Sequence, residues 1–219
     1  MAIMVDAHWL ALALAAYLIG AIPFGLVIGR LRGVDLRSLG SGNIGATNAV
    51  RAMGRRWGIV VFALDAAKAA GPVLLFPWWL AQQGHDVLEG FQSGLAVIAV
   101  TGHIFPVYLR FRGGKGVACA FGAFAALSPW VAVAAGIIYL QVLVLTRISG
   151  LGSLTATVVM VLGAWLHGDP THIRLAALGV CVLIWIRHRA NLQDLLREAS
   201  ARRSLAQRNA GNERDDQKT

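Results

Sequence analysis

Residues 116–146 read GVACAFGAFAALSPWVAVAAGIIYLQVLVLT, a stretch without a single charged side chain. An α-helix needs about 20 apolar residues to cross a membrane, so this stretch is too long for one ordinary crossing and too short for two full ones. Ser128 and Pro129 lie near its middle, where a proline readily ends one helix and starts the next. The stretch is therefore either one long crossing or a hairpin of two short helices.

Composition places the whole chain in a membrane. The chain has 219 residues, of which 57% are hydrophobic and 14% charged, whereas roughly 25% of the residues of a soluble domain are charged. The net charge of +9 raises the question of nucleic acid, but the apolar segments favour orientation in a membrane as its explanation. Cys119 and Cys181 are far apart in apolar sequence, so neither a disulfide framework nor a zinc site is implied. No metal-ligand cluster is evident, and no cofactor is expected.

Further apolar segments predict the remaining spans. They cover residues 7–29, 57–80, 91–109, 150–166 and 171–186. No Lys or Arg precedes the first of these, which is therefore predicted to be a retained helix rather than a signal peptide. Asp65 and Lys68 interrupt the second at a spacing that puts both on one helix face, which favours a structural ion pair.

The distribution of basic residues decides between the two forms of 116–146. If it is a hairpin and the N-terminus lies outside, the loops at 30–56, 110–115 and 147–149 and the tail from Arg187 are all cytoplasmic, and they hold 18 of the 20 basic residues. A single crossing places a basic segment outside, against the positive-inside bias. We therefore predict an all-α polytopic membrane bundle of about seven transmembrane helices with a cytoplasmic C-terminus. Residues 1–199 form one domain, and the polar residues 200–219 are predicted to be a disordered tail.

Two predicted cytoplasmic loops are rich in glycine. Residues 113–116 read GGKG, and residues 40–48 read GSGNIGATN with Arg51 three residues further on. Glycines at positive φ let backbone N–H groups converge on an anion, and a helix N-terminus also attracts one. The first of these loops is not a Walker A motif, because Gly116 stands where Ser or Thr follows the lysine. Taken alone, each loop is also compatible with a tight basic turn or a flexible connector.

Three segments carry a family resemblance. SGNIGATNAVR at 41–51, GHIFPVYLRFRGGKGVA at 102–118 and RHRANL at 187–192 resemble the three motifs of the bacterial acyl-phosphate:glycerol-3-phosphate acyltransferases. Weaker similarities lie at 21–25, 64–68 and 145–153, so the resemblance runs from about residue 17 to 197. It implies a seven-helix membrane bundle with its active site on the cytoplasmic side of the bacterial inner membrane.

The resemblance also implies functional residues. The implied catalytic residues are Ser41, Arg51, His103, Lys115, His188 and Asn191. The implied phosphate-binding residues are Gly42, Asn43, Gly45, Thr47, Asn48, Gly113, Gly114, Gly116 and Ser153. His103 is expected to act either as a general base or as a hydrogen-bond partner of a phosphate. The chain departs from the third motif at Asp194, Glu198 and Ser200, where the family commonly has Arg, Gly and Glu.

The implied reaction moves a fatty acyl group from acyl phosphate to the 1-hydroxyl of glycerol 3-phosphate, giving lysophosphatidic acid and phosphate at the start of phospholipid synthesis. Both substrates carry phosphate, which agrees with two glycine-rich basic loops. The expected partners are these two substrates and the lipid bilayer, with no nucleic acid and no requirement for coenzyme A or a carrier protein.

Two other classes of function compete with this interpretation. A small anion transporter shares the intramembrane charges and glycine-rich breaks, but the polar loops gather on one face and no internal repeat is evident. A scaffold subunit leaves the glycine, Asn and Thr runs unexplained.

Overall fold

The computed structural model describes residues 7–189, which form helices joined by loops. In chain order these are α1 (Ala7–Ala21), α2 (Phe24–Leu31), α3 (Ala46–Met53), α4 (Arg55–Gln82), α5 (Phe91–Ile104), the 3-10 turn η1 (Val107–Leu109), α6 (Val117–Leu127), α7 (Pro129–Thr146), α8 (Ser149–Leu166) and a helix over Thr171–Arg189, called here the 171–189 helix. The predicted tail at 200–219, Asn191 and the departures at 194, 198 and 200 lie outside the described residues.

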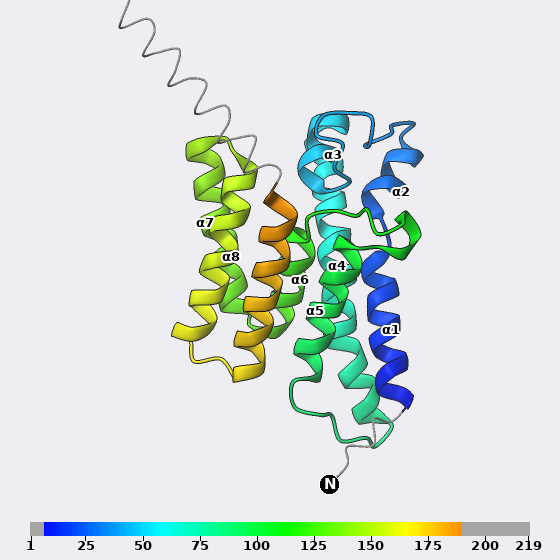
Figure 1. Cartoon of the computed structure of the whole chain (residues 1–219), viewed down its shortest axis with the longest axis vertical. Helices are drawn as coiled ribbons and strands as arrows, with labels where there is room; N and C mark the ends of the chain where they lie inside the picture. The colour runs from blue at the N-terminus through cyan, green and yellow to red at the C-terminus, as the bar shows by residue number, and fades with distance from the viewer. Residues whose placement is uncertain (1–6, 190–219) are drawn as a thin grey trace, which may run out of the picture.

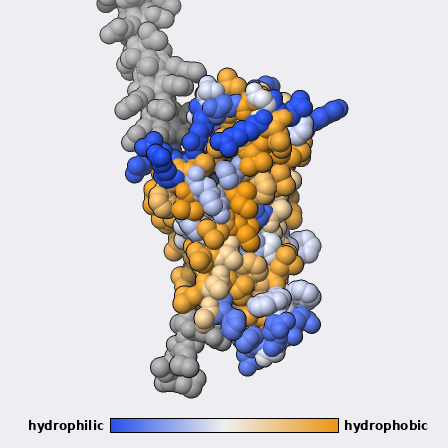
Figure 2. Space-filling model, turned by 90° about the vertical axis from the view of Figure 1, so that its right-hand side faces the viewer, coloured by the Kyte–Doolittle hydropathy of each residue, from blue (hydrophilic) through white to orange (hydrophobic). Residues whose placement is uncertain are grey.

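The predicted membrane class is confirmed. Within residues 7–189, five helical segments are long and apolar enough to cross a membrane, and the bent pair α1 and α2 makes a sixth if it is counted as one span. On the face drawn in Figure 2, apolar side chains form a broad band, and polar residues gather at its two ends. The helix α6 has 11 residues and is shorter than a full span. The number of seven spans and the orientation of the termini stay predictions.

The hairpin predicted for residues 116–146 is confirmed. The helix α6 ends at Leu127 and α7 begins at Pro129. Ser128, between them, has φ −147° and ψ 83°, outside the helical range, and Pro129 occupies the first turn of α7. Proline is favoured there because its missing N–H is not needed by the helix.

The first predicted span is broken, so the uninterrupted helix expected over residues 7–29 is wrong. The helix α1 ends at Ala21, α2 begins at Phe24, and the two axes meet at an angle of 40°. Pro23 stands at the break, where it can neither donate a backbone hydrogen bond nor fit inside a straight helix. The carbonyl of Ile22 thereby leaves the helical pattern and accepts a hydrogen bond from Lys68 Nζ at 2.6 Å.

Helix α6 lies in the middle of the bundle. Helices α1 to α5 stand on one side, and α7, α8 and the 171–189 helix stand on the other (Figure 1). Helix α6 packs against α4, α5 and α7. Gly122 allows its close approach to α4, because a Cβ at this position would overlap the backbone of Ala66. This contact fixes the helix whose first turn follows the GGKG loop.

Candidate active site

The amide of Asn48 folds the first glycine-rich loop. Its Nδ2 donates to the carbonyls of Leu36, Leu39 and Asn43 at 2.9, 3.0 and 2.9 Å, and its Oδ1 accepts from the N–H of Ser41 at 3.0 Å. Asn48 is 1% exposed. Its polar atoms are thus used by the loop itself, and the side chain holds the loop in shape at the start of α3.

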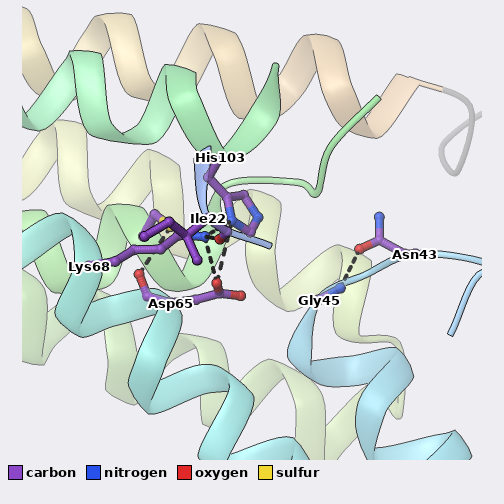
Figure 3. Close-up of polar contacts among 7 residues, drawn as sticks. Ile22, Asn43, Gly45, Asp65, Lys68 and His103 are labelled. Carbon is purple, nitrogen blue, oxygen red and sulfur yellow. Dashed lines mark hydrogen bonds and ion pairs between the residues drawn. The ribbon is translucent and has the colours of Figure 1, made fainter. Parts of the chain in front are cut away.

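Other amides of this loop are also used internally. The N–H of Gly42 donates to the Leu39 carbonyl at 3.0 Å, and that of Gly45 donates to Asn43 Oδ1 at 2.9 Å (Figure 3). Of the backbone donors expected to face a phosphate, those of Gly42 and Gly45 are therefore taken. The side chains of Ser41, Thr47 and Arg51, all of which line the cavity described below, are the stronger anion ligands of this loop.

The second loop is held from both sides. The N–H groups of Gly113 and Gly114 donate to the carbonyls of Ile104 and His103 at 3.2 and 3.1 Å. The guanidinium of Arg187 donates to the carbonyls of Gly113 and Gly114 at 2.9 and 3.2 Å. A Cβ at Gly114 would overlap His103 Nε2, so the loop requires glycine for this close approach. The N–H and carbonyl groups of Gly113 and Gly114 are bonded to other protein groups, whereas Lys115 lines the cavity.

Behind this loop lies a buried charge cluster in the membrane part of the protein. Lys68 Nζ lies 2.8 Å from Asp65 Oδ1 and 3.0 Å from His103 Nδ1 (Figure 3). The side chains of Asp65 and Lys68 are each 2% exposed. The ion pair predicted from their spacing is confirmed, and His103 joins it. Because a lysine ammonium can only donate, a neutral His103 accepts on Nδ1 and carries its proton on Nε2. The same Nδ1 lies 3.6 Å from Asp65 Oδ1, to which a protonated ring would donate.

The same cluster includes a thiol. Ligand atoms of Asp65, His103 and Cys119 lie within 4.8 Å of one another, a grouping that the sequence alone does not reveal. Cys119 Sγ is turned to the Asp65 carbonyl at 3.1 Å. The ammonium of Lys68 already contacts two of the three groups, and its positive charge opposes a second cation at this place. We therefore assign the cluster to structure.

One cavity of about 850 Å³ joins the two loops. Most of the expected site residues line it, namely Ser41, Asn43, Gly45, Thr47, Asn48, Arg51, His103, Lys115, Gly116, Ser153 and His188. Gly42, Gly113 and Gly114 are not in its wall, and Asn191 lies outside the described residues. The rest of the wall is mainly apolar and comes from α4, α6, α7 and α8.

Polar groups gather where the helix ends meet. Arg51 comes from α3, Lys115 precedes α6, and His188 lies near the end of the 171–189 helix. His188 is 2% exposed, and its Nδ1 donates to the Ile184 carbonyl at 2.8 Å, which leaves Nε2 as the acceptor in the neutral ring. The deeper wall is formed by side chains such as Phe124 and Met160. The cavity thus has a cationic end and an apolar body.

A chain of hydroxyl groups connects the two sides of the cavity. Ser149 Oγ lies 3.0 Å from Thr47 Oγ1 and 3.1 Å from the Tyr139 hydroxyl. Ser149, Tyr139 and Arg187 were not predicted as site residues from the sequence. The only signal for Arg187 was its place at the start of the RHRANL segment, and no spacing rule connects residues 47, 139 and 149.

At this end of the cavity, Lys115 lies near the positive charges of Arg51 and Arg187. The pKa of Lys115 is lowered from its ordinary value, chiefly by burial and further by the positive charges of Arg51 and Arg187. Burial without a partner disfavours an ammonium, and like charges disfavour it further. Such a concentration of positive charge is stable when an anion lies between the groups, which suits a phosphate.

Comparison with known proteins gives matches over most of the chain. A family model described as glycerol-3-phosphate acyltransferase matches residues 10–198. A glycerol-3-phosphate acyltransferase of Anaeromyxobacter sp. (strain Fw109-5) is 50% identical over 86% of this chain and 93% of its own length. One from Aquifex aeolicus (strain VF5) is 42% identical over 85% of this chain and 95% of its own length.

Solved structures agree as well. PlsY (YgiH), an integral membrane glycerol 3-phosphate acyltransferase, superposes in its glycerol 3-phosphate form with a TM-score of 0.79 at 39% identity, covering 87% of this chain and 92% of that one. Its lysophosphatidic acid form gives a TM-score of 0.78 at 38% identity with the same coverage. Because sequence, fold and length all match, this chain belongs to the glycerol-3-phosphate acyltransferase family.

Proposed function

We propose that this protein transfers a fatty acyl group from acyl phosphate to the 1-hydroxyl of glycerol 3-phosphate, producing lysophosphatidic acid and inorganic phosphate for phospholipid synthesis. The observation that carries the proposal is the single cavity with a cationic end and an apolar body. Arg51 and Lys115 compensate phosphate charge at the cationic end, while the acyl chain lies along the apolar wall. The two substrates then meet where the glycine-rich loops approach each other.

The reaction needs positioning more than covalent help from the protein. The hydroxyl oxygen attacks the acyl carbonyl carbon, the bond from that carbon to the phosphate oxygen breaks, and phosphate leaves with the bonding electrons. Acyl phosphate is a mixed anhydride with a good leaving group, so direct attack suffices. Arg51, Lys115 and the hydroxyl of Ser41 hold the charges that develop, in a site of low dielectric where such contacts are strong.

The hydroxyl proton passes to Nε2 of His188 or to a phosphate oxygen of a substrate. His103 is not assigned this role, because its Nδ1 already accepts from Lys68 and its Nε2 carries the proton when the ring is neutral. The contribution of His103 is instead to shape the second loop through its carbonyl. His188 lines the cavity, and its Nε2 has no hydrogen-bond partner within residues 7–189.

We further propose that the site faces the cytoplasm. The charge distribution puts both glycine-rich loops on the inner side, with the N-terminus outside and the C-terminus inside. Single cysteines at position 43 and at the exposed position 112, in a Cys119- and Cys181-free background, should react with an impermeant maleimide only from the inside. A cysteine at position 83 should react only from the outside. Labelling of 43 and 112 from opposite faces contradicts the orientation and the two-loop site together.

The donor is expected to be acyl phosphate alone. The described inner loops are short, and the longest of them, between α2 and α4, is folded around its own polar side chains, so no broad surface is left to grip a nucleotide or a carrier protein. Purified protein should turn over palmitoyl phosphate with glycerol 3-phosphate. It should give no product above background with palmitoyl coenzyme A or palmitoyl carrier protein.

The measurement is formation of lysophosphatidic acid from labelled glycerol 3-phosphate, with an Arg51→Ala preparation as the background control. Comparable rates with either thioester contradict the donor assignment. Absence of product with all three donors, from protein that is monodisperse in detergent, contradicts the proposed function itself.

A further inference from the structure

The second loop is unusual in how its peptide planes are fixed. In a trans peptide the carbonyl and the N–H point in opposite directions, so two partners on opposite sides fix the plane completely. In the peptide that joins Gly113 to Gly114, the carbonyl accepts from Arg187 Nη2 at 2.9 Å and the N–H donates to the His103 carbonyl at 3.1 Å. This peptide is therefore held between the 171–189 helix and α5.

The neighbouring peptides continue the pattern. Before it, the Arg112 carbonyl accepts from Arg37 at 3.3 Å, and the N–H of Gly113 donates to the Ile104 carbonyl at 3.2 Å. After it, the Gly114 carbonyl accepts from Arg187 Nε at 3.2 Å, which turns the N–H of Lys115 to the opposite side. That N–H makes no bond to another backbone group within residues 7–189. Arg187 thus acts on two successive peptides immediately before Lys115.

A guanidinium is suited to this task. Its Nε and Nη2 donors form a rigid planar fork, so one side chain can grip two consecutive carbonyls with fixed geometry. A lysine ammonium at the same position keeps the charge but lacks the fork. The next residue, His188, lines the cavity, so the same helix turn supplies a cavity residue and the clamp on the loop.

We propose that Arg187 is a positioning residue of this acyltransferase: its guanidinium fork orients the Gly113–Gly114 peptides and thereby sets the place of Lys115 and of the first turn of α6. The inference rests on the acyl transfer proposed above. Arg187 acts through the loop and not on the substrate, since its Nε and Nη2 donate to the two carbonyls and it is not part of the cavity wall.

The fork and the charge of Arg187 have separable consequences. Within residues 7–189, the charged and titratable groups that act on Lys115 are Arg51 on α3 and Arg187 and His188 on the 171–189 helix. Arg187 is one of the causes that lower the pKa of Lys115, after burial and Arg51. If protonated Lys115 holds phosphate, activity falls as pH rises through this pKa. Removal of the Arg187 charge therefore raises the pKa of Lys115, and the fall of activity at alkaline pH moves to higher pH.

Two variants test the proposal with glycerol 3-phosphate and palmitoyl phosphate. Arg187→Lys and Arg187→Gln should both lower kcat by on the order of 10- to 100-fold, the scale of a misplacement of about 1 Å, with smaller changes in KM. The alkaline limb of kcat/KM should move upward in Arg187→Gln and stay in place in Arg187→Lys. Arg55→Gln, which removes an exposed charge at the start of α4, serves as the control and should leave both unchanged.

Three results overturn the proposal while wild-type protein remains active. A wild-type kcat in Arg187→Lys removes the role of the fork. A rise in KM for glycerol 3-phosphate with unchanged kcat in both variants assigns Arg187 to substrate binding instead. A loss of kcat in Arg187→Gln with an unmoved alkaline limb and a lowered Tm reduces Arg187 to a structural residue. An inactive wild-type protein contradicts the proposed function and is distinguishable from all three.

Discussion

Replacement of Arg51 by alanine is expected to lower kcat/KM by about 100- to 1,000-fold, the usual effect of removing one charge-stabilising donor from a site of low dielectric. Arg51 lines the cavity from α3, and its charge is felt by Lys115 across the site. Without it, a cation that compensates the charge of the leaving phosphate is lost. The measurement is phosphate release from palmitoyl phosphate in the presence of glycerol 3-phosphate, with protein purified in detergent.

The matched control is Arg56→Ala. Arg56 lies in the first turn of α4, is exposed, and does not line the cavity. This change removes the same type of charge near the same end of the molecule, so activity within about twofold of wild type is expected from the small effect of surface substitutions. Equal activity of the Arg51→Ala and Arg56→Ala proteins removes the assigned role of Arg51.

Replacement of Lys68 by methionine is expected to destabilise the fold by about 3–5 kcal/mol, because it leaves the Asp65 carboxylate buried without its cation. The change also removes the donor to the Ile22 carbonyl at the break between α1 and α2. The measurement is the Tm in detergent, followed by the fluorescence of the native tryptophans. Lys68→Met should lower the Tm strongly, whatever its effect on activity.

The double variant Asp65→Leu with Lys68→Met is the control for this expectation. Replacing both charges with apolar groups of similar volume removes the unpaired carboxylate, so the double variant should be more stable than Lys68→Met alone. A single variant as stable as wild type shows that the carboxylate is neutral or hydrated. A double variant no more stable than Lys68→Met contradicts the assigned cost of the unpaired Asp65 carboxylate, because both variants lack the Lys68 contacts and differ only at residue 65.

The sequence predicts those parts of the fold that follow from local chemistry. The split at Ser128 and Pro129 was predictable because proline cannot continue a helix from the preceding turn, and the Asp65–Lys68 pair because residues three apart share a helix face. Pro23 carried the same signal as Pro129, but the charge-free sequence around it suggested one continuous span. Pro72 and Pro77 lie inside the unbroken helix α4, so proline alone does not decide the outcome.

The sequence predicted a set of site residues, most of which line one cavity, but the use of their polar atoms was not predictable. Motif matches indicate Asn48 and the glycines of both loops as phosphate-binding residues. The side-chain amide of Asn48, however, hydrogen-bonds within its own loop, and the N–H groups of Gly113 and Gly114 donate to carbonyls of α5. Such pairings join residues far apart in the chain and depend on how helices pack. The role of Arg187 likewise follows only from its distance to two carbonyls.

The wall of the cavity includes Val133, Ile137 and Leu140 of α7, whose exposed fractions are 50%, 50% and 58%. These side chains are exposed on the apolar surface of α7, so we expect the proposed fatty donor to enter sideways from the bilayer, without first passing through water. Saturation of the protein by the donor should then depend on the mole fraction of donor in the bilayer. Added neutral lipid should lower the rate because it dilutes the donor within the membrane surface. Reaction rates of this acyltransferase can therefore be compared only between assays of the same lipid or detergent content.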